Sequence, residues 1–300
     1  MKNKTYIPHG ASAADRDCGR LVTGALATGL ILAICFVSAC SHSDQGNGGS
    51  PSASPAGSTA SGVDAGAIVE KYRALDNSRD SEVKLKASIQ DSSGPARVIQ
   101  LTVLTKKQAD GGKMLLVEFT SPPEERDRDA LIVVSAGGSI EATRYTESSD
   151  SFLTTKSATD EESLFGLTLQ ELVGGQPENY TYKVLGEETY QGTPVYRIEG
   201  TLKPGIESRF PRTVMLVSKD NYAGLVIEPY DNHNELGRRI TLTRNEKVDG
   251  IWTRTQWSVD NIEDKKKIDF SAIEVKYNQN LSDTLFTRDH LKKIAARAEM

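Results

Sequence analysis

The stretch "SEVKLKASIQ" (residues 81–90) decides how the rest of this chain is interpreted. Its apolar residues, Val83, Leu85, Ala87 and Ile89, alternate with polar or charged ones. In a β-strand successive side chains point to opposite faces, so a period of two predicts a strand with one face buried. A helix would instead need apolar residues three or four positions apart.

Eleven further stretches are also typical of strands, and turn sequences such as "SSGP", "DGG", "AGG", "YQGTP" and "VDG" separate them. So many short strands in series predict a mainly β fold with a few helices. We expect a long antiparallel meander that forms a strongly curved sheet or partial barrel, and not a βαβ fold. The stretches are residues 97–106, 113–120, 130–135, 139–146, 180–186, 193–200, 213–218, 224–229, 238–243, 250–259 and 266–277.

Three stretches predict helices. "DAGAIVEKYRAL" (64–75) begins with a capping residue, Asp64, and carries one apolar face. "DEESLFGLTLQELVGG" (160–175) opens with acidic residues, ends with two glycines and has apolar residues at roughly helical spacing. We predict a short helix there that covers the sheet. Residues 287–300 are expected to form a frayed terminal helix.

The N-terminal residues have the layout of an export signal. Lysines and arginines precede an apolar run over residues 21–39 that contains no charge. The sequence "VSAC" (37–40) then resembles the bacterial lipobox, in which an aliphatic residue and small residues precede the cysteine that receives lipid. The alternative is a retained membrane helix, since the run is nearly long enough to cross a bilayer.

The signal divides the chain into three predicted parts. They are a lipoprotein signal peptide over 1–39, a lipidated Cys40 with a flexible Gly/Ser/Pro tether over 40–63, and one folded domain over 64–300. Acyl chains on Cys40 would hold the domain at a membrane. Ser41 follows the cysteine where Asp would favour retention in the inner membrane, so we predict an outer-membrane protein that faces the periplasm.

Composition excludes several kinds of function. A net charge of −5 argues against a nucleic-acid partner. The three cysteines, Cys18, Cys35 and Cys40, all precede the predicted domain. A disulfide, a cysteine nucleophile and thiolate metal ligands are therefore excluded within that domain.

No group of residues suggests catalysis. We expect His233, in a turn, and His290, in the terminal helix, to be solvated side chains. "EERDRD" (124–129) is expected to be a solvated turn before a strand. The chain contains no Gly-x-Ser-x-Gly sequence and no phosphate-binding loop. We therefore predict neither an enzyme nor a metal or cofactor site.

Several predicted strands carry aliphatic residues on both faces, as in "ARVIQLTVLT", "KMLLVEF" and "ALIVV". One face could pack under covering helices while the other lines a cavity. A lining of Leu, Ile and Val suits acyl chains, which need apolar contact without directional pairing. The alternative is a single well-packed core without a cavity.

Five motifs carry a family resemblance, and one of them is "YKVLGEETYQGTPVYRIEG" (182–200), which is similar to a hairpin of the family. "VEFTSPPEERDRDALIVV" (117–134) is similar to a Phe-x-x-Pro segment followed by a strand, and "SLFGLTLQELVG" (163–174) to a Phe/Met-Gly motif that leads to an acidic residue and Leu. "VDGIWTRTQWSV" (248–259) is similar to an Asp-Gly-x-Trp strand pair, and "YNQNLSDTLFTRDHL" (277–291) to a closing Tyr-Asn, Asp and Phe pattern. In their order along the chain, over residues 65–293, they resemble the LolA-like outer-membrane lipoprotein-sorting proteins of the LolA/LolB superfamily.

The resemblance implies an antiparallel half-barrel with a helical lid over an apolar concavity that binds lipoprotein acyl chains or related lipids. We therefore predict a membrane-anchored periplasmic lipoprotein that acts in lipid or lipoprotein sorting to or within the outer membrane, with an export machinery as a possible partner. The sequence departs from the family at Arg128-Asp129-Ala130, where the family often has Arg-x-Gly. Strand alternation and the lid motif suggest these cavity residues: Leu115, Val117, Phe119, Leu131, Val133 and Phe165.

Two other functions stay open. The chain could be an envelope sensor or scaffold that docks a transporter or signalling component without a lipid ligand. A hydrolase is a third alternative, and it would depend on His233.

Overall fold

The computed structural model describes residues 62–91, 94–156, 165 and 167–296. These residues belong to one compact unit within residues 54–300. The predicted signal peptide, Cys40 and most of the predicted tether lie outside the described residues. None of the helices in the described part of the chain is long and apolar enough to span a bilayer.

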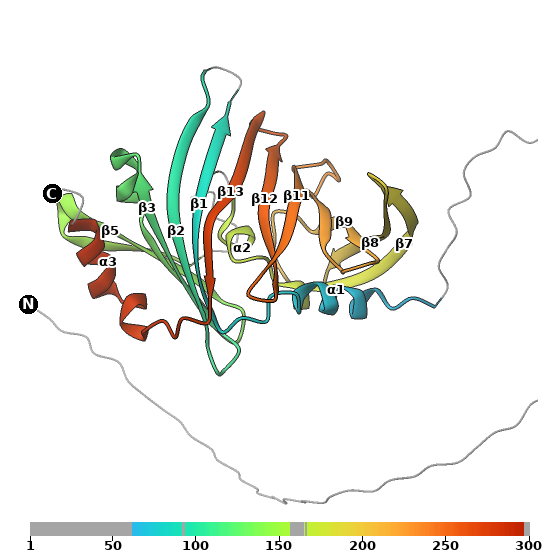
Figure 1. The fold of residues 1–300 in the computed structure, drawn as a ribbon, viewed down its shortest axis with the longest axis horizontal. Coiled ribbons are helices and arrows are strands. Elements are labelled where there is room, and N and C mark those ends of the chain that lie inside the picture. The colour runs from blue at the N-terminus through green and yellow to red at the C-terminus, as the bar shows by residue number, and fades with distance from the viewer. Residues whose placement is uncertain (1–61, 92–93, 157–164, 166, 297–300) are drawn as a thin grey trace, which may run out of the picture. The chain divides into compact units, whose positions relative to one another are not determined.

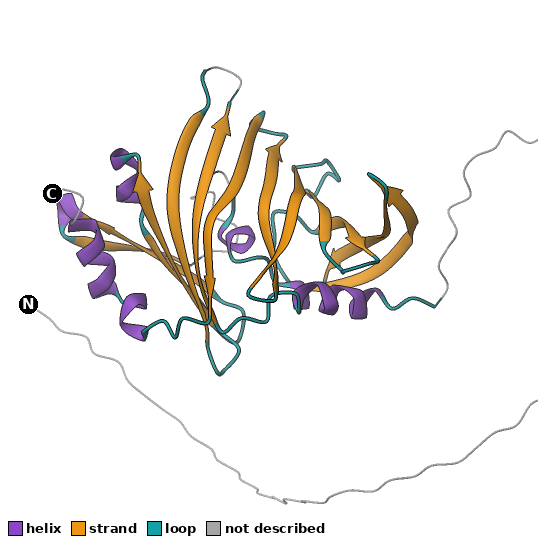
Figure 2. Cartoon of the chain, in the orientation of Figure 1, coloured by secondary structure: helices purple, strands orange, loops and turns teal. Residues whose placement is uncertain are grey.

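The described strands form a single antiparallel sheet that is curved and does not close (Figure 2). The prediction of a mainly β, antiparallel half-barrel is thus confirmed. In chain order the strands are β1 (Asp80–Gln90), β2 (Arg97–Lys107), β3 (Lys113–Ser121), β4 (Ala130–Val134), β5 (Ile140–Thr146), β6 (Ser151–Thr155), β7 (Tyr180–Tyr190), β8 (Thr193–Leu202), β9 (Arg212–Ser218), β10 (Gly224–Tyr230), β11 (Arg238–Val248), β12 (Ile251–Asn261) and β13 (Lys266–Tyr277).

The sheet consists of two meanders that meet at β1. This strand pairs with β2, with Leu85 opposite Leu101, and with β13, with Leu85 opposite Ala272. The strand order is therefore β6-β5-β4-β3-β2-β1-β13-β12-β11-β10-β9-β8-β7. Although β6 and β7 are consecutive in the chain, they lie at opposite edges, so the connection between them has to cross one face of the sheet.

Register shifts interrupt the ladders at several places. One lies between Lys84 and Leu85 in the β1–β13 pair, and another between Val184 and Gly186 in the β7–β8 pair. An extra residue in one strand bends it and increases its twist. These irregularities are consistent with the curvature of the sheet in Figure 1.

The connection from β6 to β7 carries Phe165 and the short helix α2 (Leu169–Leu172). We call Phe165 together with residues 167–175 the lid. Its apolar side chains pack on one face of the sheet, the lid face, in the largest cluster of buried residues. From the sheet this cluster includes Leu85, Ala87, Ile89, Ile99, Leu101, Leu115, Val117, Phe119, Ala130, Ile132, Val134, Ile140, Val259, Ile268 and Phe270, and from the lid Phe165, Leu169 and Val173.

The opposite face of β3 to β5 is covered by helix α3 (Arg288–Ala295) and the 3-10 helix η5 (Asp283–Phe286). We call it the α3 face. Strands β3 and β4 supply both faces because their side chains alternate. The α3-face cluster consists of Leu116, Leu131, Tyr145, Phe286, Leu291 and Ile294.

Two predicted helices are confirmed over the described residues, while residues 297–300 of the predicted terminal helix lie outside them. Helix α1 (Ala65–Arg73) is capped by Asp64, whose Oδ1 accepts hydrogen bonds from the backbone N–H groups of Gly66 and Ala67 at 2.8 and 3.3 Å. Its Ile68 packs with buried residues of β8 and β9. Helix α3 begins after Thr287, whose side chain accepts from the backbone N–H of His290.

The helix predicted over residues 160–175 is confirmed only at Leu169–Leu172. Phe165 has a φ of +64°, which is incompatible with a right-handed helix. Thr168 caps α2, so the helix begins after it. Residues 157–164 and 166 lie outside the described residues. The other 3-10 helices among the described residues are η1 (Pro123–Arg128), η2 (Glu147–Ser149) and η4 (Pro177–Asn179).

Candidate functional site

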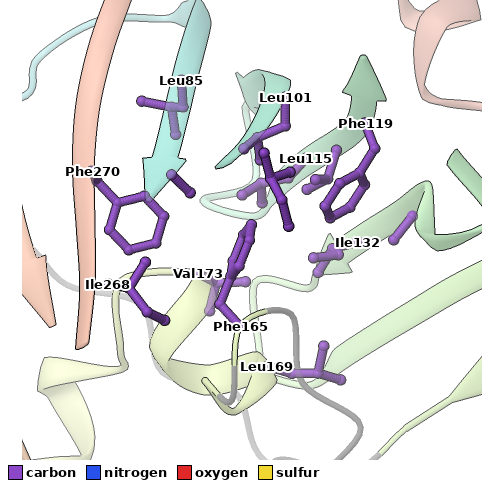
Figure 3. Close-up of a cluster of buried hydrophobic side chains, with 14 of the residues drawn as sticks. Leu85, Leu101, Leu115, Phe119, Ile132, Phe165, Leu169, Val173, Ile268 and Phe270 are labelled. Atoms are coloured by element: carbon purple, nitrogen blue, oxygen red, sulfur yellow. The ribbon is translucent and has the colours of Figure 1, made fainter. Parts of the chain in front are cut away.

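Phe165 lies at the centre of an aromatic group on the lid face (Figure 3). Its ring centroid is 5.9 Å from that of Phe119 on β3 and 5.5 Å from that of Phe270 on β13. On its other side Phe270 stacks on Trp257 of β12, with 4.9 Å between centroids and 9° between planes. Such tilted and offset pairs stabilise by about 0.5–1.5 kcal/mol beyond burial of their area.

The backbone of Phe165 is strained. A φ of +64° brings the Cβ of an L-residue close to the backbone and costs about 1–2 kcal/mol. For a bulky side chain such a conformation persists only where the surroundings enforce it. Here the packing of the ring among Phe119 and Phe270 holds it, so the strain and the placement of the ring are linked.

Polar contacts hold both ends of α2, and the contact at its C-terminal end joins the lid to the sheet. At its N-terminus Thr168 and Glu171 form a reciprocal capping box, with Thr168 N donating to Glu171 Oε2 at 2.8 Å. At its C-terminus the Lys113 Nζ on β3 donates to the Val173 carbonyl. Burial lowers the pKa of Lys113, and a cation at this end is favoured by the helix dipole.

A buried ion pair connects the lid to β11. Glu171 Oε1 lies 3.1 Å from Arg238 Nε, and the Arg238 side chain is 2% exposed. Burial lowers the pKa of Arg238, and the charge of Glu171 opposes that shift. The lid is thus joined to the β1–β6 part of the sheet through Lys113 and to the β7–β13 part through Arg238.

A pocket of about 510 Å³ opens beside Phe165, where the β1–β2 hairpin, η1 and the start of β13 meet. This volume is within the range of ligand sites, about 300–1,000 Å³. Its walls are partly apolar and partly charged. The lining residues are Ile89, Asp91, Gly94, Pro95, Arg97, Arg128, Phe165, Lys266 and Ile268.

Two of the pocket's arginines are held by one buried carboxylate. Glu125, only 4% exposed, accepts hydrogen bonds from Nη1 of Arg97 at 2.8 Å and from Nη1 of Arg128 at 2.7 Å. The Arg128 guanidinium also lies over the rings of Phe119 and Phe165, at 5.3 and 5.9 Å from their centroids. Charge-assisted pairs of this kind fix the side chains in position.

Asp129 anchors the other end of η1. Its Oδ1 accepts a hydrogen bond from the Phe119 backbone N–H at 2.7 Å, and the residue is 4% exposed. Burial raises the pKa of Asp129 to about 7. The expectation that "EERDRD" is a solvated turn is therefore wrong for Glu125 and Asp129, because each finds partners on the neighbouring strands.

Four of the six predicted cavity residues share the lid face. Leu115, Val117 and Phe119 project from β3 to the same side, where Phe165 covers them. Figure 3 shows Phe165 directed from the lid toward Phe119. Phe165 contacts Phe119 directly, and all four side chains belong to one buried cluster.

The structure places the other two, Leu131 and Val133, on the opposite face. Leu131 packs in the α3-face cluster, and Val133 is 38% exposed. The register of β3 with β4 puts Leu115 opposite Ile132, so the even-numbered residues of β4 face the lid. The prediction that Leu131 and Val133 line the cavity is therefore wrong, because alternation along β4 turns both side chains away from the lid.

The remaining predicted residues are not gathered at this site. Cys40 lies outside the described residues. His233 is exposed in the β10–β11 turn, and His290 is half-buried in α3. In the part of the chain that the structure describes, no group of His, Cys, Asp and Glu could hold a metal ion.

Sequence reasoning missed the charged side of the pocket. Arg97 and Lys266 are the first residues of β2 and β13, and they come together only because both strands flank β1. Arg128 could have been found from the sequence, because it stands at the arginine position of the family's Arg-x-Gly pattern.

The comparisons with known proteins agree with this architecture. A family model described as "Uncharacterized protein" matches residues 111–293, more than half of the chain. No curated protein matches.

Three solved structures share the fold. A DUF1329 family protein from Desulfovibrio piger is 23% identical, with a TM-score of 0.70 over 76% of this chain and 97% of that one. A putative outer membrane lipoprotein-sorting protein domain from Vibrio parahaemolyticus is 16% identical, with a TM-score of 0.67 over 76% and 98%. A LolA superfamily protein from Nitrosomonas europaea is 15% identical, with a TM-score of 0.61 over 76% and 99%. The resemblance predicted from the motifs is therefore confirmed for the fold.

Proposed function

The chain belongs to this family of uncharacterized proteins, and we propose that it is a membrane-anchored periplasmic lipoprotein that binds acyl chains of lipids or lipoproteins on its lid face. In this proposal it serves lipid or lipoprotein sorting to or within the outer membrane, together with an export machinery. It is a binding protein and not an enzyme. Two proteins of similar fold support a role in lipoprotein sorting. One is described as a putative outer membrane lipoprotein-sorting protein domain and the other as a LolA superfamily protein.

The observation that carries the proposal is the position of Phe165. Its ring covers apolar residues of β1, β3 and β13 and at the same time forms a wall of the pocket. Its strained backbone favours leaving this conformation once an equivalent apolar group takes the place of the ring. An acyl chain supplies such a group, because it needs bulk apolar contact and no directional partner.

The anchor completes the proposal. Acyl chains on Cys40 would keep the domain at the membrane that supplies its ligand, and the Gly/Ser/Pro sequence after Cys40 would serve as a tether. Replacing Cys40→Ala should abolish acyl labelling and membrane fractionation. Unchanged membrane attachment would instead indicate a retained helix.

A photo-crosslinking experiment tests ligand binding in the full chain. We replace Phe165 by p-benzoylphenylalanine and, as a matched control, Val133, which lies on the opposite face. After irradiation of cells, the peptide that contains the probe is isolated and weighed, so acyl chains on Cys40 do not interfere. We expect lipid adducts at position 165 and none at position 133.

Two results would count against the proposal. Lipid adducts of equal yield at both positions would mean unspecific contact with the membrane. A reproducible protein adduct at position 165, without lipid, would favour the alternative function of a sensor or scaffold that docks a protein partner through its lid.

A further inference from the structure

The pocket beside Phe165 contains more charge than an acyl chain needs. Arg97, Arg128 and Lys266 reach it from β2, η1 and β13, while Asp91 is the acidic residue in its lining. Glu125 already pairs with both arginines, and the Arg97 side chain is 57% exposed. Three cations against the two carboxylates Asp91 and Glu125 still leave an excess of one positive charge at the opening, which points to an anionic ligand group.

The two arginines keep donors for such a group. Each guanidinium has five N–H donors, and Glu125 accepts from one nitrogen of each. Glu125 is buried, so it orients both side chains without reaching into the open volume. Arg128 is additionally held over the rings of Phe119 and Phe165.

Lys266 is the cation most available to a ligand. It is half-buried in the pocket wall, and within the described residues it forms no ion pair. The next residue, Lys267, is exposed, and the Lys267 Nζ lies 3.4 Å from Asp269 Oδ1. Successive residues of β13 point to opposite faces, so only Lys266 lines the pocket.

The apolar wall lies next to these cations. Ile89 and Ile268 are paired across β1 and β13, are both buried, and continue into the lid-face cluster with Phe165. An apolar chain that enters there would leave its polar end among the cations.

We propose that this pocket binds the anionic head of an amphiphile, a phosphate or a carboxylate, while the attached chain runs along Ile89, Ile268 and Phe165. The inference rests on the proposed function, since it specifies the head of the ligand whose chain occupies the lid face. Arginine and lysine recognise both heads by charge-assisted hydrogen bonds.

The test uses the full chain in vesicles of phosphatidylcholine and phosphatidylglycerol in equal amounts, with identical acyl chains and a small fraction of isotope-labelled palmitate. The probe p-benzoylphenylalanine replaces the exposed Pro95 at the pocket rim. A second variant carries it at Phe165, which keeps the readout if the hairpin does not tolerate the first change. Adducts are identified by mass.

We expect an anionic lipid to be enriched about tenfold over phosphatidylcholine, relative to its share of the vesicle, because the quaternary ammonium of phosphatidylcholine cancels the charge of its phosphate and is repelled by the cations of the pocket. Enriched phosphatidylglycerol identifies a phosphate head, and enriched palmitate a carboxylate head. Lys266→Gln should lower the enrichment severalfold, whereas the matched control Lys267→Gln should leave it unchanged. Asp91→Asn should raise it.

Equal labelling by charged and neutral lipids, or equal effects of Lys266→Gln and Lys267→Gln, would overturn the inference while leaving acyl-chain binding intact. No lipid adduct with either probe would contradict the proposed function itself, and the inference with it.

Discussion

The two faces of β3 and β4 are covered in different ways. On the α3 face an eight-residue helix packs Leu291 and Ile294 against the strands, and Leu291 is fully buried. On the lid face the covering helix has four residues and is held by polar contacts, while a strained Phe165 supplies the central apolar contact. The same strands thus carry one cover that packs through a regular helix and one in which a residue with a strained backbone supplies the central contact.

The largest effect should come from the ion pair that joins the lid to β11. Glu171→Gln removes a charge that faces the buried Arg238. Removing one partner of a buried pair costs about 3–5 kcal/mol, since the other charge stays in a poorly solvating place. We expect a loss of about 4 kcal/mol in the free energy of unfolding, measured by urea denaturation. A loss below about 1 kcal/mol would mean that this ion pair contributes little to stability.

Next in size is the loss of packing on the α3 face. Leu291→Ala removes a fully buried side chain and should lower the free energy of unfolding by about 3 kcal/mol. Lipid adducts at position 165 should not change, because Leu291 contacts the opposite face. A parallel loss of lipid adducts would contradict the separation of the two faces.

The third effect depends on pH. The folded-state pKa of Asp129 is raised from 3.8 to about 7, so its contribution to stability is fully present below the unfolded value and is lost as the pH rises through about 7. Asp129→Asn should remove this dependence. The difference in free energy of unfolding between variant and native protein should then grow by about 3 kcal/mol from pH 4 to pH 7, since each pH unit between the two pKa values contributes about 1.4 kcal/mol.

Denaturation of both proteins at several pH values measures that difference, in which the titration of all other carboxyl groups cancels. A difference that stays constant would show that Asp129 ionises normally. Leu291→Ala serves as the control, since it should shift stability equally at every pH.

The smallest effect compares two substitutions at one position. Phe165→Ala and Phe165→Gly both remove the ring, but only glycine adopts a φ of +64° without strain. The glycine variant should therefore be more stable than the alanine variant by about 1 kcal/mol. The opposite order would mean that the backbone at residue 165 is not strained.

Much of the fold follows from local patterns in the sequence. The alternation in "SEVKLKASIQ" predicts β1 almost to its ends, and Asp64 marks the start of α1. Strand β6, "SFLTT", was not predicted, because five residues with a single alternation give too weak a pattern. The predicted lid helix was too long, since apolar spacing alone does not show that Thr168 caps a later start.

The site was harder to predict because its parts are distant in sequence. Alternation along β4 separates Ala130, Ile132 and Val134 from Leu131 and Val133, but it does not say which set the lid covers. Glu125 is buried because Arg97, 28 residues earlier, lies beside it. Only the strand order, with β1 between β2 and β13, brings these residues together.

The two attachments of the lid have a geometrical consequence for the whole half-barrel. Val173 is bound by Lys113 of β3 and Glu171 by Arg238 of β11, and four strands lie between β3 and β11. The lid therefore holds β3 and β11 at a fixed distance from each other across the concave side of the sheet. If the sheet became flatter, these two strands would move apart and one of the two contacts would break. The curvature of the sheet and the position of Phe165 are therefore coupled.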